Sequence, residues 1–337
     1  MVKKPELRHL YSDKVSRLAE INRDFGLGTA ISRAMKYGID KPIRKIYSSL
    51  FEYRNGPGID IMQEDWDNLI ILDACRYDYF ESQIGINGNL TSVISRGAHS
   101  WEFMKNNFVD RQFHDTIYVT ANPYADRLQD DVFYLVENTL DDWDKKIETV
   151  HPQTIVERTV RAHRQNPNKK LIIHFMQPHI PYLGPTADEI RERIDLTGYG
   201  YHTATNKESR NEEKKTWWKA LDRGEITEKE IKKCYEESLD IVLEEVKELT
   251  KLINGKSVVT SDHGEMLGER GLVQKRYGHP HDIYNNKLRK VPWFIINSDS
   301  QRNIISEEPI DFERIDFERI DKNKLDEHLK ALGYKPE

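Results

Sequence analysis

The segment SVVTSDHGE, residues 257–265, places two acids and an imidazole directly after a short apolar run. Asp262, His263 and Glu265 form a cluster that is costly in a protein core and unnecessary on a surface. Carboxylate oxygens and imidazole nitrogens are ligands of Zn²⁺, Mn²⁺ and related divalent ions. Adjacent side chains of a strand point apart, so Asp262 and His263 can bind one ion only if the chain turns, and Gly264 permits a turn. We therefore interpret this segment as a metal-binding turn.

Polar side chains also end or interrupt two other apolar runs. Asp73 follows LIIL, and His174 and His179 lie in and just after LIIHF. In open α/β sheets, ligands bind outside the carboxyl ends of the parallel strands, so three such strands would bring these side chains to one edge. A single strand-ending Asp is often only a helix N-cap, and a single His is usually structural. The convergence of three runs is therefore better evidence for a metal site than any one residue.

The strands and helices that must position these residues follow from the apolar pattern. Short continuous apolar runs predict buried strands at 69–72, 169–182, 256–265 and 289–297. Apolar residues at three-to-four spacing predict helices within 1–58 and at 124–140, 152–165 and 227–253. Strands that alternate with helices predict an α/β fold, with a mostly parallel central sheet and helices on both of its faces.

Three parts are expected along the chain. Residues 1–58 form a basic helical arm that ends at the breaker NGPG, residues 59–300 form the α/β domain, and residues 301–337 form a tail. A highly charged insertion is expected at about 186–226, where the Trp217–Trp218 pair packs the insertion on the body or covers a site; we expect packing. The tail contains two copies of IDFERI, too few for a solenoid, and is expected to be a surface helix or extended.

Charge is distributed unevenly in this chain of 337 residues, which has a net charge of −6. The first 50 residues carry 11 Lys and Arg against 5 Asp and Glu, which leaves about −12 for the remainder. Such a basic arm either contacts an anionic membrane or polymer or, more commonly, docks on the acidic body. We expect no nucleic-acid partner, and the oligomeric state is not indicated.

Two cysteines, Cys75 and Cys234, allow at most one disulfide, so the fold does not depend on a disulfide framework. The first residues contain no apolar signal-peptide core, and no run approaches 18 apolar residues. We therefore expect a cytoplasmic protein, with membrane association through the arm as the alternative.

The motifs resemble a known family. TSDHGEMLGERGLVQKRYGHPHDIYNNKLRKVPWFII, residues 260–296, resembles the C-terminal half of the sulfatase signature in the alkaline phosphatase superfamily. In that signature a strand ending in S/T-D-H-G-E is followed by G-x-x-G-L, a lysine and a V-P pair that enters the next strand. FMQPHIPY is similar to the P-H-x-P-Y segment, and IILDACRYD to the first metal-binding strand of prokaryotic sulfatase-like proteins. The resemblance spans roughly residues 65–298.

The resemblance implies an alkaline phosphatase/sulfatase-like fold that holds one or two divalent ions, Zn²⁺, Mn²⁺, Ca²⁺ or Mg²⁺. It implies metal ligation by Asp73, Asp262 and His263, with His279 as a further metal- or phosphate-binding residue and His281 as a second choice for that role. It also implies that Lys275 and His179 contact the sulfate or phosphate oxygens of the substrate.

Two departures from the family pattern bear on the chemistry. Sulfatases begin with paired acids, whereas Asp73 is followed by Ala74. The C/S-x-P-x-R motif, whose Cys or Ser becomes formylglycine, does not occur in this chain. We therefore expect no formylglycine chemistry and look for a hydroxyl nucleophile.

Ser100 is the preferred nucleophile, because the superfamily places this group at a helix start after the first metal strand. HSWEFMKNNF, residues 99–108, reads as a helix with Ser100 at its N-cap, and a helix N-terminus favours anions. Ser95 and Thr91 are alternatives, and a purely structural N-cap serine is the competing interpretation. Arg76 and Arg96 either clamp a tetrahedral anion or are structural.

The expected function is metal-dependent hydrolysis of phosphoric or sulfuric esters, including those of a glycan or lipid head group. Two alternatives stay open at this point. One is a phosphotransferase that modifies a lipid or glycan, and the other is a non-catalytic member that binds an anion or glycan.

Overall fold

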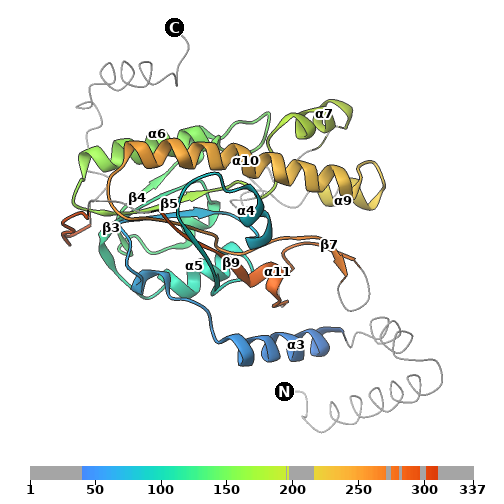
Figure 1. Cartoon of the computed structure of the whole chain (residues 1–337), viewed down its shortest axis with the longest axis horizontal. Coiled ribbons are helices and arrows are strands. Elements are labelled where there is room, and N and C mark those ends of the chain that lie inside the picture. Colours follow the sequence, from blue (N-terminus) through green and yellow to red (C-terminus); the bar gives the residue numbers. More distant parts are fainter. Residues whose placement is uncertain are drawn as a thin grey trace, which may run out of the picture.

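A seven-stranded sheet forms the centre of the computed structural model, which describes residues 40–194, 196, 216–270, 275–280, 283–296 and 301–309 (Figure 1). The strand order is β2-β9-β6-β1-β5-β3-β4. Strands β6, β1, β5, β3 and β4 run parallel, whereas β9 is antiparallel to both β6 and β2. The strands are β1 (Asn68–Leu72), β2 (Asn89–Ile94), β3 (Phe113–Thr120), β4 (Phe133–Asn138), β5 (Lys170–Phe175), β6 (Ser257–Thr260) and β9 (Lys290–Ile296).

Helices cover both faces of this sheet (Figure 1). The α-helices are α3 (Asp40–Asn55), α4 (Tyr77–Gln83), α5 (Ser100–Phe108), α6 (Pro152–Gln165), α7 (Pro185–Arg193), α9 (Trp217–Asp222), α10 (Glu228–Leu252) and α11 (Asn286–Arg289). Short 3₁₀ turns are η1 (Ile61–Gln63), η2 (Pro123–Arg127) and η3 (Leu140–Asp142). A separate antiparallel hairpin consists of β7 (Met266–Arg270) and β8 (Lys275–Gly278).

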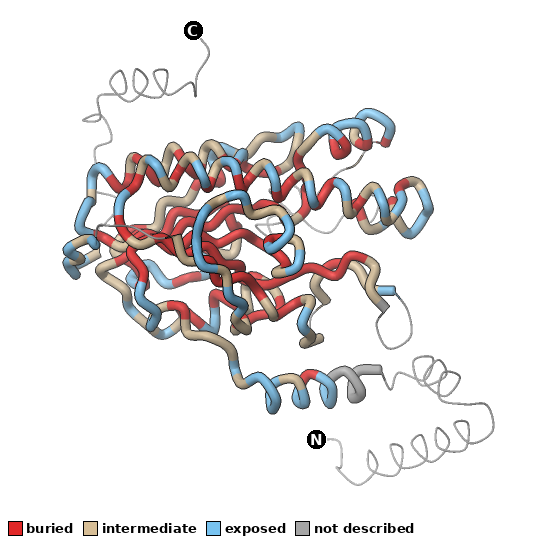
Figure 2. Tube along the Cα trace, in the orientation of Figure 1, coloured by how far each residue is buried: buried red, intermediate tan, exposed pale blue. Residues whose placement is uncertain are grey.

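Strand β1 shows why helices must pack on both faces of the sheet. Its side chains alternate between faces, and every one of its residues is buried. Ile70 and Leu72 pack in a core with side chains of α4, α6 and α10, whereas Leu69 and Ile71 pack with side chains of α5. Figure 2 shows this buried layer between more exposed helices. The predicted α/β class with a mostly parallel sheet is confirmed.

The predicted strands at 69–72, 169–182, 256–265 and 289–297 contain β1, β5, β6 and β9, although the observed strands are shorter. The helix predicted at 124–140 is wrong, because this segment forms η2 and then β4. In β4 the buried Phe133 and Leu135 are two residues apart, and the strand pairs with β3. The period is that of a strand with one face on the core. Strands β2 and β3 were also missed by the apolar pattern.

The two other predicted helices are confirmed as α6 and α10. Helix α10 begins with a capping box, in which Thr227 and Glu230 each accept from the other residue's backbone N–H. Within the expected insertion, Trp217 is buried and its ring centroid lies 5.1 Å from that of Tyr182. Trp217 therefore packs the insertion on the body, as expected.

The predicted arm contains α3, and its residues 1–39 lie outside the described part of the chain. In the tail, residues 301–309 lie against the body, where the N–H of Ile305 donates to the carbonyl of Asn168 at 2.9 Å. The repeat at 310–321 lies outside the described residues. Cys75 and Cys234 are both buried and free. None of the described helices is both long enough and apolar enough to span a bilayer.

Candidate metal and ester-cleavage site

The turn after β1 delivers Asp73 to the carboxyl edge of the sheet. Ala74, the next residue, has a positive φ of 60°, an uncommon conformation for a residue with a Cβ atom. The hydroxyl of Tyr235, on α10, donates to the Ala74 carbonyl at 2.7 Å and accepts from the Arg76 N–H at 2.9 Å. The Ala74 N–H in turn donates to Oδ1 of Asp262 at 3.0 Å. The tight turn therefore places Asp73 just beyond the carboxyl end of β1, and its hydrogen bond connects β1 to Asp262.

The turn after β6 brings Asp262 and His263 to the same place. Ser261 Oγ accepts from the Cys75 N–H at 2.8 Å and donates to the Leu72 carbonyl at 2.6 Å, which joins the ends of β6 and β1. The Asp262 carboxylate accepts from the N–H of His263 at 2.8 Å. The predicted turn is present, so both side chains face one point.

Gly264 acts differently from the expectation that it supplies conformational freedom. Its φ is not in the positive region, but a Cβ atom there would overlap the carbonyl oxygen of Lys287. The N–H of Gly264 donates to the Leu288 carbonyl at 2.8 Å. Glycine is needed because the turn packs directly on the backbone of α11.

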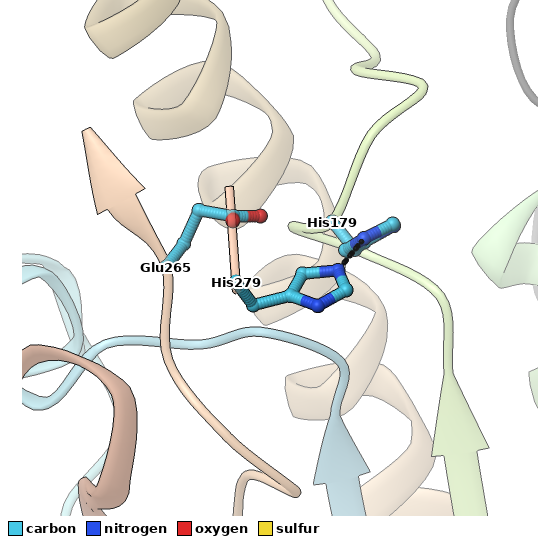
Figure 3. A group of neighbouring side chains, drawn as sticks. All are labelled: His179, Glu265 and His279. Atoms are coloured by element: carbon cyan, nitrogen blue, oxygen red, sulfur yellow. Dashed lines mark hydrogen bonds between the residues drawn. The ribbon is translucent and has the colours of Figure 1, made fainter. Parts of the chain in front are cut away.

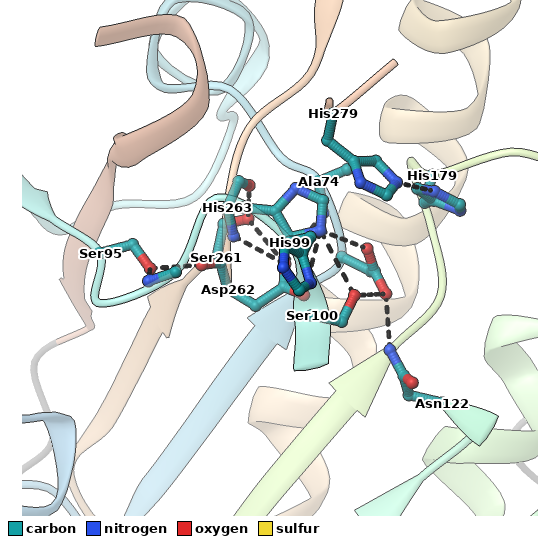
Figure 4. Close-up of polar contacts among 12 residues, drawn as sticks. Ala74, Ser95, His99, Ser100, Asn122, His179, Ser261, Asp262, His263 and His279 are labelled. Atoms are coloured by element: carbon teal, nitrogen blue, oxygen red, sulfur yellow. Dashed lines mark hydrogen bonds and ion pairs between the residues drawn. The ribbon is translucent and has the colours of Figure 1, made fainter. Parts of the chain in front are cut away.

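Five side chains meet at this edge, and Figure 4 labels three of them, Ser100, Asp262 and His263. His263 Nε2 lies 3.4 Å from Asp73 Oδ1, 3.4 Å from Asp262 Oδ2 and 3.3 Å from Ser100 Oγ. Ser100 Oγ also donates to Asp73 Oδ2 at 3.2 Å. We call Asp73, Ser100, His174, Asp262 and His263 the strand-end cluster; all are buried.

His174 belongs to the cluster, although the sequence did not predict it to be a metal ligand. Its Nε2 lies 3.9 Å from Asp73 Oδ2 and 3.8 Å from Asp262 Oδ2, and its Nδ1 is 2.8 Å from the Tyr118 hydroxyl. The imidazole in the apolar run LIIHF was the only signal in the sequence. It sits in β5, beside β1, so the register of the parallel strands aims it at the carboxylates.

Asn122 is a second residue that the sequence did not single out. Its Nδ2 donates to Asp73 Oδ2 at 2.8 Å, and its Oδ1 accepts from the N–H of Tyr124 at 3.0 Å. Asn122 is buried at the end of β3, where it also caps η2. It therefore fixes the orientation of the Asp73 carboxylate from a third strand.

The donor set fits a divalent cation. Asp73 Oδ1, Asp262 Oδ2 and His174 Nε2 are all buried without a hydrogen-bond partner among the described residues, and a ligand atom of each lies within 4.8 Å of the others. Buried polar atoms left without partners are costly, and a cation would satisfy all three at once. His263 Nδ1 lies 2.8 Å from the Gly264 carbonyl, which accepts its proton and leaves the Nε2 lone pair for a metal.

The electrostatics show the same demand for positive charge. Burial alone would lower the pKa of His263, but the carboxylates of Asp262 and Asp73 raise it to about 10. Burial and repulsion from Asp73 together raise the pKa of Asp262. Without a metal ion, the imidazolium is thus the cation that balances two adjacent carboxylates.

His179, Glu265 and His279 form a second group of candidate metal ligands (Figure 3). The Nε2 atoms of the two histidines are 2.9 Å apart, and the ring centroids of His263 and His279 are 4.6 Å apart. Both carboxylate oxygens of Glu265 and the Nδ1 of His279 are buried without a described hydrogen-bond partner. Burial raises the pKa of Glu265 to about 8 and lowers that of His279 well below its usual value. Glu265 is the acid that joins the two histidines predicted from the sequence.

Of the three candidate nucleophiles, the structure brings Ser100 alone into the strand-end cluster. Ser95 Oγ donates to the backbone carbonyl of Asp262, and Thr91 Oγ1 donates to that of Trp293 within the paired strands β2 and β9. The N-cap of α5 is His99, whose Nδ1 accepts from the N–H of Glu102, so Ser100 is the first helical residue. The expected N-cap position of Ser100 is therefore wrong, and its hydroxyl turns toward Asp73 and does not cap the helix.

Lys275, expected to contact the substrate, and Arg76 and Arg96, expected either to clamp an anion or to be structural, form ion pairs with carboxylates of the chain. Lys275 forms an ion pair with Glu228 of α10, and its side chain is 55% exposed. Arg76 is buried between Asp78 and Glu269. Arg96 Nη1 lies 3.2 Å from Asp60 and donates to the Asn106 carbonyl. Each of these charges lies beside a carboxylate of the chain, and their expected contacts with a substrate stay predictions. His281 lies outside the described residues.

No protein-family model and no curated protein sequence matches this chain. Solved structures do match, among them the C-terminal periplasmic domain of EptC from Escherichia coli in complex with Zn. It has 14% identity and a TM-score of 0.40, over 72% of this chain and 76% of that chain. The corresponding domain of phosphoethanolamine transferase EptC from Campylobacter jejuni has 14% identity and a TM-score of 0.38, over 69% and 78%.

Lipooligosaccharide phosphoethanolamine transferase A from Neisseria meningitidis, an integral membrane protein, has 13% identity and a TM-score of 0.41, over 85% of this chain and 59% of that chain. A Bacteroides fragilis protein with a provisional sulfatase assignment has 20% identity and a TM-score of 0.23, over 46% and 31%. The expected cytoplasmic location therefore stays a prediction.

Replacing Asp262 by Asn should abolish metal binding, because one carboxylate and its charge are removed from the strand-end cluster. We expect the wild-type protein to retain Zn²⁺ or Mn²⁺ through dialysis and the variant to lose it, as measured by elemental mass spectrometry. Asp188→Asn makes the same change at an exposed position of α7 and should leave the metal content unchanged. Full metal occupancy in Asp262→Asn would contradict the assignment of the cluster.

Glu265→Gln should remove a pH dependence of stability from the metal-free protein. The pKa of Glu265 rises from 4.5 to about 8 on folding, so the free energy of unfolding falls as the pH rises from about 4.5 to about 8. At pH 8 we expect this acid to cost about 4 kcal/mol, and the neutral amide avoids that cost.

Urea unfolding of the chelator-treated proteins at pH 5 and pH 8 measures this effect. The exposed Glu244→Gln variant is the matched control and should follow the wild type at both pH values. If the free energy of unfolding depends on pH equally in the wild type and in Glu265→Gln, folding does not raise the pKa of Glu265, and the prediction is wrong.

Proposed function

We propose that this protein is a metal-dependent hydrolase of phosphate esters that uses Ser100 as its nucleophile. The observation that carries the proposal is the position of the Ser100 hydroxyl, 3.2 Å from Asp73 Oδ2 and 3.3 Å from His263 Nε2. A serine that only begins a helix has no need of contacts with two candidate metal ligands from two other strands. These two contacts support a catalytic role for the Ser100 hydroxyl.

The residues of the chain orient the hydroxyl and prepare its surroundings. Asp73 accepts the Ser100 hydrogen bond, and Asn122 holds that carboxylate in place. Ser100 lies at the start of α5, where the positive end of the helix dipole favours an anionic group. The site is deeply buried, which strengthens the attraction between these groups and a tetrahedral anion.

Asp73, His174, Asp262 and His263 would hold a divalent ion, Zn²⁺ or Mn²⁺ by the chemistry of the donors. Such an ion supplies Lewis-acid stabilisation to the oxygens of the transferred group, lowers the pKa of a hydroxyl or water beside it, and so assists both halves of a two-step hydrolysis. His179, Glu265 and His279 would contact the remaining oxygens or hold a second ion.

The proposed reaction has two steps. In the first, Ser100 Oγ bonds to phosphorus, the ester P–O bond breaks, and the alcohol leaves with a proton. In the second, water attacks the phosphoserine, which releases inorganic phosphate and restores the hydroxyl. A phosphotransferase would share the first step and differ only in its acceptor, an alcohol in place of water. Product analysis in the presence of added alcohols separates these two outcomes.

Ser100→Ala should keep the fold and the metal but lower kcat by at least about a thousandfold, because the covalent step disappears. The measurement is hydrolysis of an aryl phosphate, alongside metal content and circular dichroism. Ser82→Ala is the control and should be fully active, because Ser82 is an exposed serine of α4 whose hydroxyl donates to the Tyr79 carbonyl. Near wild-type turnover by Ser100→Ala would remove this residue as the nucleophile.

Phosphate esters should be turned over faster than matched sulfate esters. A formylglycine hydrate releases sulfate by elimination through its second hydroxyl, and a serine has no such hydroxyl. The sulfated serine would have to be attacked by water, whereas phosphoserine hydrolysis is the reaction that a divalent ion assists.

The test is kcat/KM on p-nitrophenyl phosphate, a phosphate diester and the sulfate, with Zn²⁺, Mn²⁺ and Ca²⁺ supplied in turn. A clear preference for sulfate with every metal would show that the nucleophile is misassigned.

A further inference from the structure

Helix α3 is held against the body by one side only (Figure 1). Ser48 Oγ accepts from the N–H of Tyr284 at 3.1 Å, and Glu52 lies 3.7 Å from the guanidinium of Arg289. The same guanidinium lies 5.7 Å from the ring centroid of Phe51. Ser48 is buried in this contact. The docked side of α3 is therefore polar and specific.

The other side of α3 exposes large apolar side chains to solvent. Ile46, Tyr47, Leu50 and Tyr53 are 59%, 53%, 47% and 89% exposed. Their spacing places them along one side of the helix, and we call them the α3 stripe. Among the described residues, the remaining exposed large hydrophobic side chain is Ile305 of the tail. Figure 2 shows α3 as a mostly exposed helix with one buried position.

Such a concentration of apolar side chains on one element marks a binding surface, because exposed apolar residues are otherwise scattered singly. Two of the four are tyrosines, whose rings are apolar and whose hydroxyls stay hydrated. This combination is enriched where a protein meets the boundary between lipid head groups and acyl chains. The side chains of the α3 stripe therefore suit a surface with a polar outer layer and an apolar interior, such as a lipid bilayer.

Charge distinguishes the candidate occupants of the stripe. Helix α3 has four basic residues, Lys41, Arg44, Lys45 and Arg54, against two acids. Residues 1–39 before it carry 8 basic and 4 acidic residues. A second copy of α3, or the preceding segment folded back, would therefore bring positive charge onto positive charge. An anionic lipid surface attracts this arm, whereas it repels the acidic remainder of the chain.

We propose that the α3 stripe docks on an anionic lipid surface. Ile46 and Leu50 enter the boundary of the acyl chains, Tyr47 and Tyr53 lie at the level of the head groups, and the exposed Lys45 and Arg54 of α3 contact lipid phosphates. This is binding in the plane of the interface, and it is independent of the proposed esterase chemistry.

The docked side of α3 connects this surface to the candidate site. Tyr284, which donates to Ser48, also donates through its hydroxyl to Glu102 in the first turn of α5. Arg289, which lies beside Glu52, donates through Nε to the Ser95 carbonyl at 2.8 Å. Lipid binding at α3 would therefore hold the helix that begins with Ser100 at a fixed position relative to the membrane surface.

The experiment is sedimentation of the full-length protein with vesicles. We expect binding to phosphatidylcholine vesicles that contain phosphatidylserine, weaker binding to phosphatidylcholine alone, and loss of binding at high salt. The double variant Ile46→Glu with Leu50→Glu should bind at least about tenfold more weakly. Lys229→Gln with Lys247→Gln on α10 makes the same change in net charge away from the stripe and should bind as the wild type does.

Three results would overturn the proposal. The first is that the wild-type protein binds neither kind of vesicle. The second is that the Ile46→Glu, Leu50→Glu variant binds vesicles as strongly as the wild type. The third is that the wild type forms a concentration-dependent dimer in light scattering and that this variant is monomeric. Tyr53→Ser with Tyr47→Ser provides a milder test, because Tyr53 is almost fully exposed and contributes little to the fold. It should weaken vesicle binding while circular dichroism and thermal unfolding stay unchanged, and undiminished binding would likewise reject the α3 stripe.

Discussion

Two carboxylates held side by side out of water are the constraint on which the rest of this structure depends. Asp73 and Asp262 come from neighbouring parallel strands, are almost completely buried, and each leaves one oxygen without a hydrogen-bond donor. Two like charges in such a place repel each other and lose their hydration. The arrangement is stable only with positive charge between them, supplied by His263 in the metal-free protein and by a divalent cation when one is bound.

Much of the surrounding fold maintains that costly arrangement. Tyr235 from α10 braces the positive-φ turn at Ala74, and Ser261 joins the ends of β1 and β6. Asn122 orients one carboxylate from β3. These contacts come from elements far apart in the sequence, and each satisfies a backbone or carboxylate group that would otherwise be buried without a partner. The rigidity of the site is thus a property of the whole sheet edge.

The substrate side of the site differs from the expected pattern in a consistent way. Lys275, Arg76 and Arg96 are each balanced by carboxylates of the chain, and the groups turned toward the strand-end cluster are His179, Glu265 and His279. The described residues around the cluster on this side are therefore imidazoles and an acid, and the Lys and Arg side chains named above are paired with carboxylates of the chain.

The sequence by itself determined the α/β class, four of the strands, helices α6 and α10, and the residues Asp73, Asp262 and His263, because runs of apolar residues and the side chains that end them are local patterns. It also singled out Ser100, His179 and His279. The tertiary structure decided what local patterns did not: β4 in place of a helix, the contact of Asn122 with Asp73, and the pairing of Lys275 with Glu228. It also decided which group each of His174 and Glu265 joins, although the sequence had already drawn attention to both residues. Strand order and register bring these residues together across more than a hundred positions, and an ion pair forms with whichever partner the folded chain places within reach.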